Sequence, residues 1–139
     1  MGAVRTEEGT EVLYVRSRVV LAARAAGIIA IDQAVAQVRD DDLYRRDAAM
    51  GRNLGYHGKM CVLPRQLALC HEVFSPAAAE VDYSRRLLAA YAAAEAQGIG
   101  TIAFEGKLLD GPILRRARDV VAMTERLAQR ATQQKEGSA

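Results

Sequence analysis

The chain has 139 residues, which is enough for one domain with a core of its own, and half of its residues are apolar, with alanine supplying much of that half. The net charge of +2 comes from interspersed acids and bases, so the clustered basic face of a nucleic-acid-binding protein is not indicated. No apolar stretch approaches the ~18 residues of a membrane span, and the N-terminus lacks the pattern of a secretion signal. Two cysteines do not make a disulfide framework. We therefore expect a cytoplasmic protein without a membrane or nucleic-acid partner.

The first predicted elements are a helix and a strand. Helical spacing of apolar residues predicts a helix over residues 10–26, and Gly27 is expected to end it. The side chains expected to face the core are Val12, Val15, Val19, Ala22, Ala23 and Ala26. Arg16 lies off this stripe. The β-branched run over residues 28–32 predicts a fully buried strand.

A second helix and strand follow. Three aspartates at residues 40–42 suit a helix N-terminus, and a helix is predicted from there to Leu54. Its periodic positions are Leu43, Asp47, Met50 and Leu54. Residues 59–63 predict another buried strand, and Pro64 opens a short helix that reaches about Val73. Alternation of strands and helices favours parallel strands in an α/β fold.

The second half of the chain is predicted to be mainly helical. Ser75 is expected to cap a long helix that has Pro76 in its first position and ends at Gly98. Residues 101–109 predict two very short strands around a Glu-Gly turn, and Pro112 opens the last helix. From residue 130 onward the sequence is polar and predicts a frayed tail.

Two short motifs could suggest metal or phosphate binding. Cys61, Cys70 and the two histidines lack the close pair spacing of a zinc site, so free buried thiols are favoured. The segment GYHGKM partly matches the phosphate-loop motif, but it lacks the first glycine and the Ser or Thr after the lysine. Lys59 could still contact a phosphate as a point charge. A lysine without such a role, at the mouth of a strand, is the favoured interpretation.

Several aspartates are candidates for chemistry. The run at residues 40–42 could hold a divalent cation, although it lacks the alternating spacing of a calcium loop, and a capped helix start is favoured. Asp32 ends a predicted strand, where α/β folds place functional groups, and a functional or a structural role fits it equally well. Asp110 precedes a helical Gly-Pro step, and local rules favour a helix cap over a catalytic group.

Longer segments resemble a known family. The segments YVRSRVVLAARAAGIIAID, LGYHGKMCVLPRQL and VFSPAAAEVDYSRRLLAAYAAAEAQGIGTIAFEGKLLDGPILRRA are similar to the citrate lyase beta-subunit and malyl-CoA lyase-like family of the HpcH/HpaI aldolase superfamily. Family members are (β/α)₈ TIM barrels of roughly twice this length with a C-terminal helical extension. The resemblance implies that residues 1–74 are the C-terminal segment of a TIM barrel, with its last two strands and flanking helices. It implies that residues 75–139 are a helical lid or oligomerisation extension with a short β-hairpin.

The resemblance also implies site residues. Asp110 matches the aspartate that acts as general acid/base in relatives, where it reaches into the active site of a neighbouring subunit. Val62 and Leu63, followed by Pro64, match the segment near the acyl-CoA; Leu63 replaces the usual histidine, so only a backbone contact to CoA could persist. Relatives hold Mg²⁺ with a Glu and an Asp on the strands upstream, and no metal ligand is assigned in this chain. The role of Asp32 is left open.

The implied function is a Mg²⁺-dependent carbon–carbon lyase, or a thioesterase, acting on a malyl-, citramalyl- or citryl-CoA thioester. Without the metal ligands the chain by itself is expected to be inactive. Its expected partners are further copies of itself, a full-length lyase subunit or a separate N-terminal half. One alternative is a non-catalytic module that docks on a full-length lyase subunit. Another is a truncated remnant or a start codon placed too late.

Overall fold

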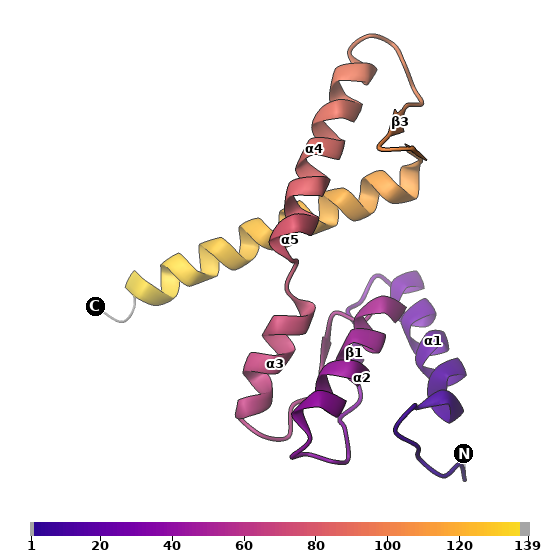
Figure 1. Cartoon of the computed structure of the whole chain (residues 1–139), viewed down its shortest axis with the longest axis vertical. Helices are drawn as coiled ribbons and strands as arrows, with labels where there is room; N and C mark the ends of the chain where they lie inside the picture. The colour runs from indigo at the N-terminus through magenta and orange to yellow at the C-terminus, as the bar shows by residue number, and fades with distance from the viewer. Residues whose placement is uncertain (1, 137–139) are drawn as a thin grey trace. The chain divides into compact units, whose positions relative to one another are not determined.

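The computed structural model describes residues 2–136 (Figure 1). The chain divides into two compact units, Met1–Phe74 and Ser75–Ala139, and each is described by itself. Within the described residues, none of the helices combines the length and the apolar character needed to span a membrane.

The first unit alternates helices and strands. Its elements are α1 (Thr10–Ala25), β1 (Ile31–Asp32), α2 (Asp41–Leu54), β2 (Gly58–Lys59) and α3 (Arg65–Phe74). The strands β1 and β2 pair in parallel, with Ile31 opposite Gly58 and Asp32 opposite Lys59. The predicted parallel α/β arrangement of this unit is confirmed. In Figure 1 the three helices lie beside this short pair of strands.

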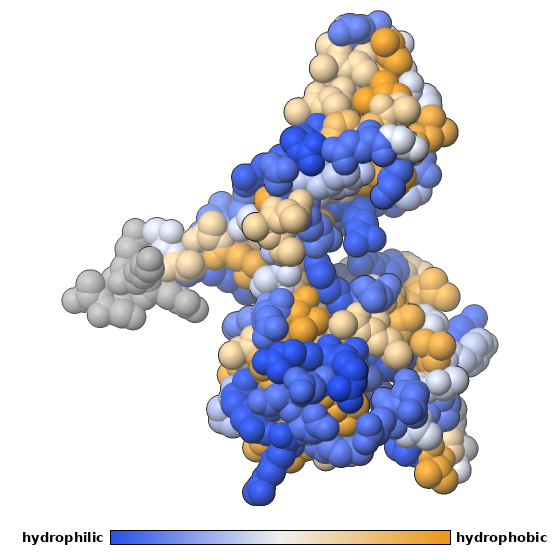
Figure 2. Space-filling model, viewed as in Figure 1, coloured by the Kyte–Doolittle hydropathy of each residue, from blue (hydrophilic) through white to orange (hydrophobic). Residues whose placement is uncertain are grey.

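Both strands are shorter and more exposed than predicted. Only the last two residues of the run at 28–32 form β1, and β2 ends at Lys59 instead of Leu63. Ile28, Ile29 and Ile31 are 62%, 69% and 51% exposed, so the prediction of a fully buried strand was wrong. The pair has no third strand beside it among the described residues, and its apolar side chains are therefore uncovered. Figure 2 shows such apolar residues at the surface among polar ones.

The helices of this unit begin and end close to the predicted positions. Asp40 caps α2, because its side chain accepts a hydrogen bond from the Leu43 N–H at 2.8 Å. Gly55, in the left-handed conformation with φ 103°, ends the helix as expected. In α1 the buried residues are Arg16, Val20 and Ala23, so most of the predicted core stripe was wrong. Arg16, which lies off the predicted stripe, is only 3% exposed.

The core of the first unit joins all three helices to the strands. Its buried members are Val20, Ala23, Ala30, Val35, Leu43, Tyr44, Ala48, Tyr56, Leu69 and Phe74. Tyr44 and Ala48 are fully buried on α2, which packs against both α1 and α3. This core holds the carboxyl ends of the two strands in place.

The second unit is a helical pair with a hairpin. Its elements are α4 (Ala78–Glu95), β3 (Ala103–Phe104), β4 (Lys107–Leu108) and α5 (Gly111–Glu136). The antiparallel strands turn at Glu105 and Gly106, whose φ values of 48° and 76° match a two-residue hairpin turn. Leu87, fully buried, packs with Leu109, Leu114 and Ala117 into the core between α4 and α5.

Two predicted boundaries in this unit were wrong. The N-cap of α4 is Ala77, which makes no side-chain cap, so Ser75 and Pro76 lie outside the helix. The helix α5 runs to Glu136, past the predicted start of a frayed tail at residue 130. Figure 1 shows this end of α5 extending beyond α4, and residues 125–133 are exposed. Good helix formers in this segment, including alanine, glutamine and arginine, favour helix without a packing partner.

Candidate functional site

The parallel pairing of β1 and β2 places two charged residues side by side. Asp32 and Lys59 are the last residues of their strands and lie in register. Their side chains meet, with Lys59 Nζ 3.3 Å from Asp32 Oδ2. The structure therefore brings together two residues that the sequence analysis considered separately.

Arg16 and Asp47 complete a buried ion network with this pair. The Arg16 guanidinium donates to both carboxylate oxygens of Asp32, at 3.2 Å from Nε and 2.5 Å from Nη2. A third donor, Arg16 Nη1, lies 2.9 Å from Asp47 Oδ1. The network thus links α1, β1, α2 and β2, and its two cations balance two carboxylates.

Lys59 uses its ammonium group entirely within the network. Besides Asp32, Nζ contacts the Asp47 carboxylate and donates to the Gln33 carbonyl oxygen at 2.7 Å. Its side chain is 0% exposed. All three N–H donors are occupied, so the interpretation of Lys59 as a phosphate contact is not supported by its surroundings. Asp32 is 1% exposed and binds both cations of the network, so its role here is structural too.

The electrostatics of Arg16 follow from these contacts. Burial opposes the charged guanidinium, but the hydrogen bonds and charges of Asp32 and Asp47 outweigh burial and raise the pKa of Arg16 above its ordinary value. Burial also raises the pKa of the nearby Tyr56 hydroxyl, and the Asp32 charge adds to that increase. Tyr56 donates to the Arg16 carbonyl oxygen at 3.1 Å, so it ties the backbone of α1 to the same place.

Gly51 has no side chain, and this leaves room for the buried ion network. A Cβ atom at this helical position would lie 2.5 Å from Asp32 Oδ2 and 3.5 Å from Arg16 Nη2. The approach to Asp32 Oδ2 is too short to be tolerated, so any side chain would push the carboxylate away from its partners.

We therefore expect Gly51→Ala to destabilise the protein by about 1–3 kcal/mol. The sign is informative, because alanine in a helix interior normally stabilises by about 1 kcal/mol relative to glycine. Urea unfolding of both chains measures the difference. Gly111→Ala is the matched control: Gly111 begins α5 and has nothing within 4 Å of a Cβ, so no loss is expected there. An equal effect at both positions would contradict the steric explanation.

The segment after β2 holds the two predicted CoA contacts. The N–H groups of Val62 and Leu63 both donate to Gln66 Oε1, at 2.7 and 3.2 Å. Gln66 is 1% exposed, and its Nε2 donates to the Val38 carbonyl oxygen at 3.2 Å. These two N–H groups are already satisfied, while the Val62 side chain is 55% exposed. A ligand at this segment would meet side chains and carbonyl groups instead of N–H groups.

Asp110 lies in the second unit, directly before α5. Its Oδ1 accepts a hydrogen bond from the Ile113 N–H at 3.1 Å, and its carbonyl oxygen accepts from the Leu114 N–H at 3.1 Å. This is the geometry of an N-terminal helix cap. The residue is exposed, so the carboxylate remains accessible to another molecule. The cap and a chemical role are therefore compatible.

The remaining acidic candidates have protein partners. Asp41 pairs with Arg65 at 3.2 Å and Asp42 with Arg45 at 3.1 Å, beside the capping Asp40. Within residues 2–136, no group of three or more His, Cys, Asp or Glu side chains is arranged to hold a metal ion. A pocket of about 60 Å³ lies beside Asp47 and Gln37. Small-molecule sites occupy roughly 300–1,000 Å³, so this pocket does not hold a CoA ester by itself.

Sequence reasoning missed four residues of this region. Arg16, Asp47, Gly51 and Gln66 were not proposed as site residues, although three of them carried a signal. Asp47 is a charge on the predicted apolar stripe of its helix, Gly51 is a glycine inside a predicted helix, and Arg16 follows apolar residues closely. Nothing in the sequence marked Gln66, because its role depends on the path of the segment before it.

Comparisons with known proteins show what the chain is similar to. Residues 1–64 match the family described as HpcH/HpaI aldolase/citrate lyase. The chain is 47% identical over 122 residues to the citrate lyase subunit beta-like protein of Deinococcus radiodurans and 39% identical over 121 residues to citrate lyase subunit beta of Escherichia coli K12. It is 32% identical over 123 residues to human mitochondrial citramalyl-CoA lyase. The chain resembles this family, and its similarity is to the C-terminal part of the relatives.

The matches cover most of this chain and under half of each relative. They span 88%, 87% and 88% of the chain but 43%, 40% and 36% of the three proteins. The protein CitE of Mycobacterium tuberculosis, crystallised with magnesium, acetoacetate and coenzyme A, superposes with a TM-score of 0.75 at 26% identity, over 88% of this chain and 45% of CitE. A citrate lyase of Burkholderia xenovorans LB400 gives a TM-score of 0.71 at 22% identity, over 86% of this chain and 37% of its own, and shares the fold.

Proposed function

We propose that the chain supplies the C-terminal part of a CoA-ester lyase that cleaves a carbon–carbon bond in a citryl-, malyl- or citramalyl-CoA type substrate. The observation that carries the proposal is Asp110, an accessible carboxylate held at the start of α5 in a chain similar to citrate lyase subunit beta and citramalyl-CoA lyase. Thioester hydrolysis at the same site is the related alternative within this class.

Asp110 is the acid/base of this proposal. Cleavage of the bond between the acyl α-carbon and the hydroxyl-bearing carbon leaves an electron pair on the α-carbon, and a proton must arrive there. A carboxyl group can deliver that proton and recover it later. The Ile113 N–H holds Oδ1 at 3.1 Å, which fixes the direction of the carboxylate. Catalysis would therefore use the helix cap as the device that orients the acid.

The segment of Val62 and Leu63 is the proposed CoA contact. Its two N–H groups bind Gln66, so the contact proposed here uses the exposed Val62 side chain and the free faces of the segment. Gln66 would then have an indirect role, because it fixes the path of the backbone. The crystal of the Mycobacterium tuberculosis protein with coenzyme A supports this class of ligand.

Magnesium does not fit the carboxylates that this chain offers. Mg²⁺ requires oxygen ligands in octahedral geometry, but Asp32 and Asp47 are committed to Arg16 and Lys59. We therefore assign no metal ligand and derive no step through the ion. If the reaction requires Mg²⁺, as the magnesium in the Mycobacterium tuberculosis crystal suggests, its ligands come from outside this chain.

A partner chain is part of the proposal. In a (β/α)₈ barrel, β1 and β2 would be the last two strands and would need neighbours on both edges. The exposed Ile29, Ile31 and Met60 suit such contacts. The partner is a full-length lyase subunit, an N-terminal part of one, or another copy of this chain. A monodisperse monomer in sedimentation, together with a cooperative transition in thermal unfolding, would contradict this expectation.

Reconstitution tests the proposed activity. We expect the purified chain alone to leave malyl-, citramalyl- and citryl-CoA intact, and we expect cleavage when it is mixed with the unmatched N-terminal part of the Deinococcus radiodurans relative and Mg²⁺. The reaction is measured as release of the product acyl-CoA, which chromatography detects. The N-terminal part alone is the control. Robust cleavage by the chain alone would contradict the proposal that the chain needs a partner for activity.

A non-catalytic docking role is the second candidate. The end of α5 favours it, because residues 125–133 are helical and exposed. A docking module would bind the same partner, yet its complex would gain no turnover from Asp110. Binding without any dependence of turnover on Asp110 therefore distinguishes this candidate from the lyase.

A further inference from the structure

Two free thiols converge on one carbonyl group in the first unit. Cys61 Sγ lies 3.6 Å and Cys70 Sγ lies 3.8 Å from the carbonyl oxygen of Lys59. The Tyr44 hydroxyl is 3.2 Å from Cys61 Sγ. Because both sulfur atoms are within hydrogen-bonding distance of the same atom, they are neighbours in the fold.

The groups that the thiols contact are uncharged: the Lys59 carbonyl oxygen and the Tyr44 hydroxyl. Both cysteines are free, half-buried and packed against the core of the first unit. Burial, with hydrogen bonds between Tyr44 and the two cysteines, raises the pKa of Tyr44 above its ordinary value, so its hydroxyl stays neutral. Neither cysteine residue is fully buried, and exposure favours the oxidation of a thiol.

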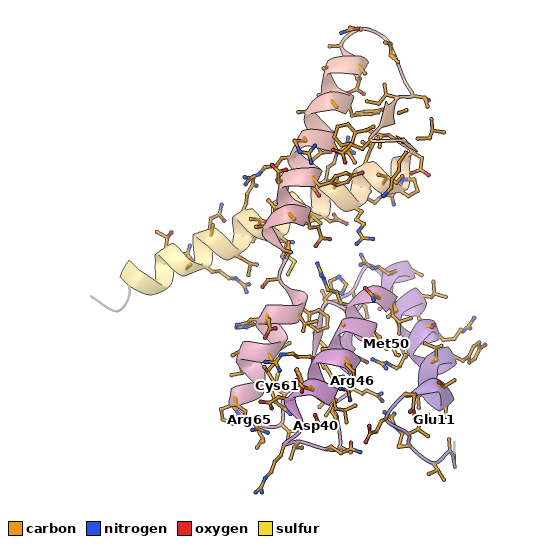
Figure 3. All side chains as sticks on the ribbon, viewed as in Figure 1. Glu11, Asp40, Arg46, Met50, Cys61 and Arg65 are labelled. Carbon is orange, nitrogen blue, oxygen red and sulfur yellow. The ribbon has the colours of Figure 1, made fainter. Side chains whose placement is uncertain are left out.

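The two thiols lie on segments of different secondary structure. Cys70 is inside α3, whereas Cys61, labelled in Figure 3, follows β2 in a stretch without regular structure. A disulfide needs Cβ atoms about 3.5–4.5 Å apart and a defined torsion. A disulfide would therefore require the segment at Cys61 to move while the helix holds Cys70.

We propose that Cys61 and Cys70 form a reversible dithiol–disulfide pair, a modification site whose oxidant is a hydroperoxide. One thiol reacts with hydrogen peroxide to give a sulfenic acid and a molecule of water. The other thiol then attacks the sulfenic sulfur, which forms the S–S bond and releases a second water. The two thiols lose two electrons in total, and the peroxide is reduced to two waters. A dithiol reductant restores both thiols by exchange.

The disulfide would change the segment that follows β2. Cys61 would leave the Tyr44 hydroxyl, and the adjacent Val62 would be drawn away from Gln66 Oε1, which now accepts its N–H at 2.7 Å. This consequence concerns the shape of the segment and does not depend on the proposed lyase activity.

Mass spectrometry of the full chain after mild hydrogen peroxide treatment tests the pair. We expect a monomer that has lost two hydrogens, resists alkylation at both cysteines and regains both thiols with dithiothreitol. Cys61→Ser and Cys70→Ser should each abolish this species. Independent sulfinic acids at each cysteine, or a disulfide only between chains, would overturn the proposal.

A redox titration separates the effect of the fold from simple closeness in sequence. The full chain is equilibrated with reduced and oxidised glutathione in native buffer and in concentrated urea. We expect the effective concentration of one thiol for the other to be at least about tenfold higher in native buffer. An equal or lower value in native buffer would show that the fold does not bring the thiols together, and the proposal would fail.

Discussion

Asp32→Asn is expected to destabilise the protein by about 3–5 kcal/mol, because it leaves buried positive charge without its partner. Asp32 is 1% exposed and is bound by the Arg16 guanidinium and the Lys59 ammonium. Asparagine keeps the shape of the side chain and removes its charge, so two cations would then share Asp47 alone. Urea unfolding followed by circular dichroism measures the loss.

A charge-balanced double variant makes this result specific. We expect Asp32→Asn combined with Lys59→Met to lose less stability than the sum of the two single variants, because one cation and one carboxylate are removed together. Asp42→Asn is the control within the same unit: Asp42 pairs with Arg45 at 3.1 Å with its side chain 82% exposed, and such pairs contribute no more than about 1 kcal/mol. Additive losses in the double variant would argue against an electrostatically coupled network.

Asp110→Asn is expected to reduce turnover of the reconstituted lyase by about 10²–10⁴-fold. Asparagine caps a helix about as well as aspartate, so the hydrogen bond to the Ile113 N–H and the start of α5 should persist. The variant thus removes the acid/base and keeps the structure. The measurement is kcat for cleavage of the CoA ester in the complex, together with the unfolding midpoint of the chain.

The matched control for this variant is Asp40→Asn. Asp40 caps α2 through the Leu43 N–H at 2.8 Å, the same arrangement that Asp110 makes with Ile113 at 3.1 Å. We expect unchanged turnover for Asp40→Asn and unchanged stability for both variants. If Asp110→Asn kept full turnover, Asp110 would be a cap only, and the docking role would be favoured.

The sequence was informative about helices because capping and periodicity act locally. Asp40 at the start of α2 and Gly55 at its end follow from the chemistry of helix termini. The boundary at Ser75 was wrong for a physical reason: a serine is a good cap, but the chain enters α4 two residues later, at Ala77, and no local rule fixes that path. The strands were overestimated because an apolar run was taken as evidence of burial, and burial requires a neighbour.

Only some of the site residues could be predicted from the sequence, for a similar reason. Asp110 could be proposed because its motif is contiguous, Asp32 because it ends a predicted strand, and Lys59 because it follows a glycine at the start of one. Their partners Arg16 and Asp47 come from helices, and helical spacing indicates which residues share a face without saying what lies opposite that face. Arg16 therefore lay off the predicted apolar stripe, although it is buried against carboxylates from two other elements.

The sequence by itself determined the resemblance to citrate lyase-type proteins, the order of helices and strands, and the residues able to act as caps or acids, because these depend on neighbouring residues and on motifs within the chain. Only the tertiary structure decided which charges are buried, that Gln66 occupies the N–H groups of Val62 and Leu63, and that Cys61 and Cys70 share one carbonyl group. Those facts depend on contacts between residues far apart in the chain. A buried charge is tolerated only where such contacts supply an opposite charge and hydrogen bonds.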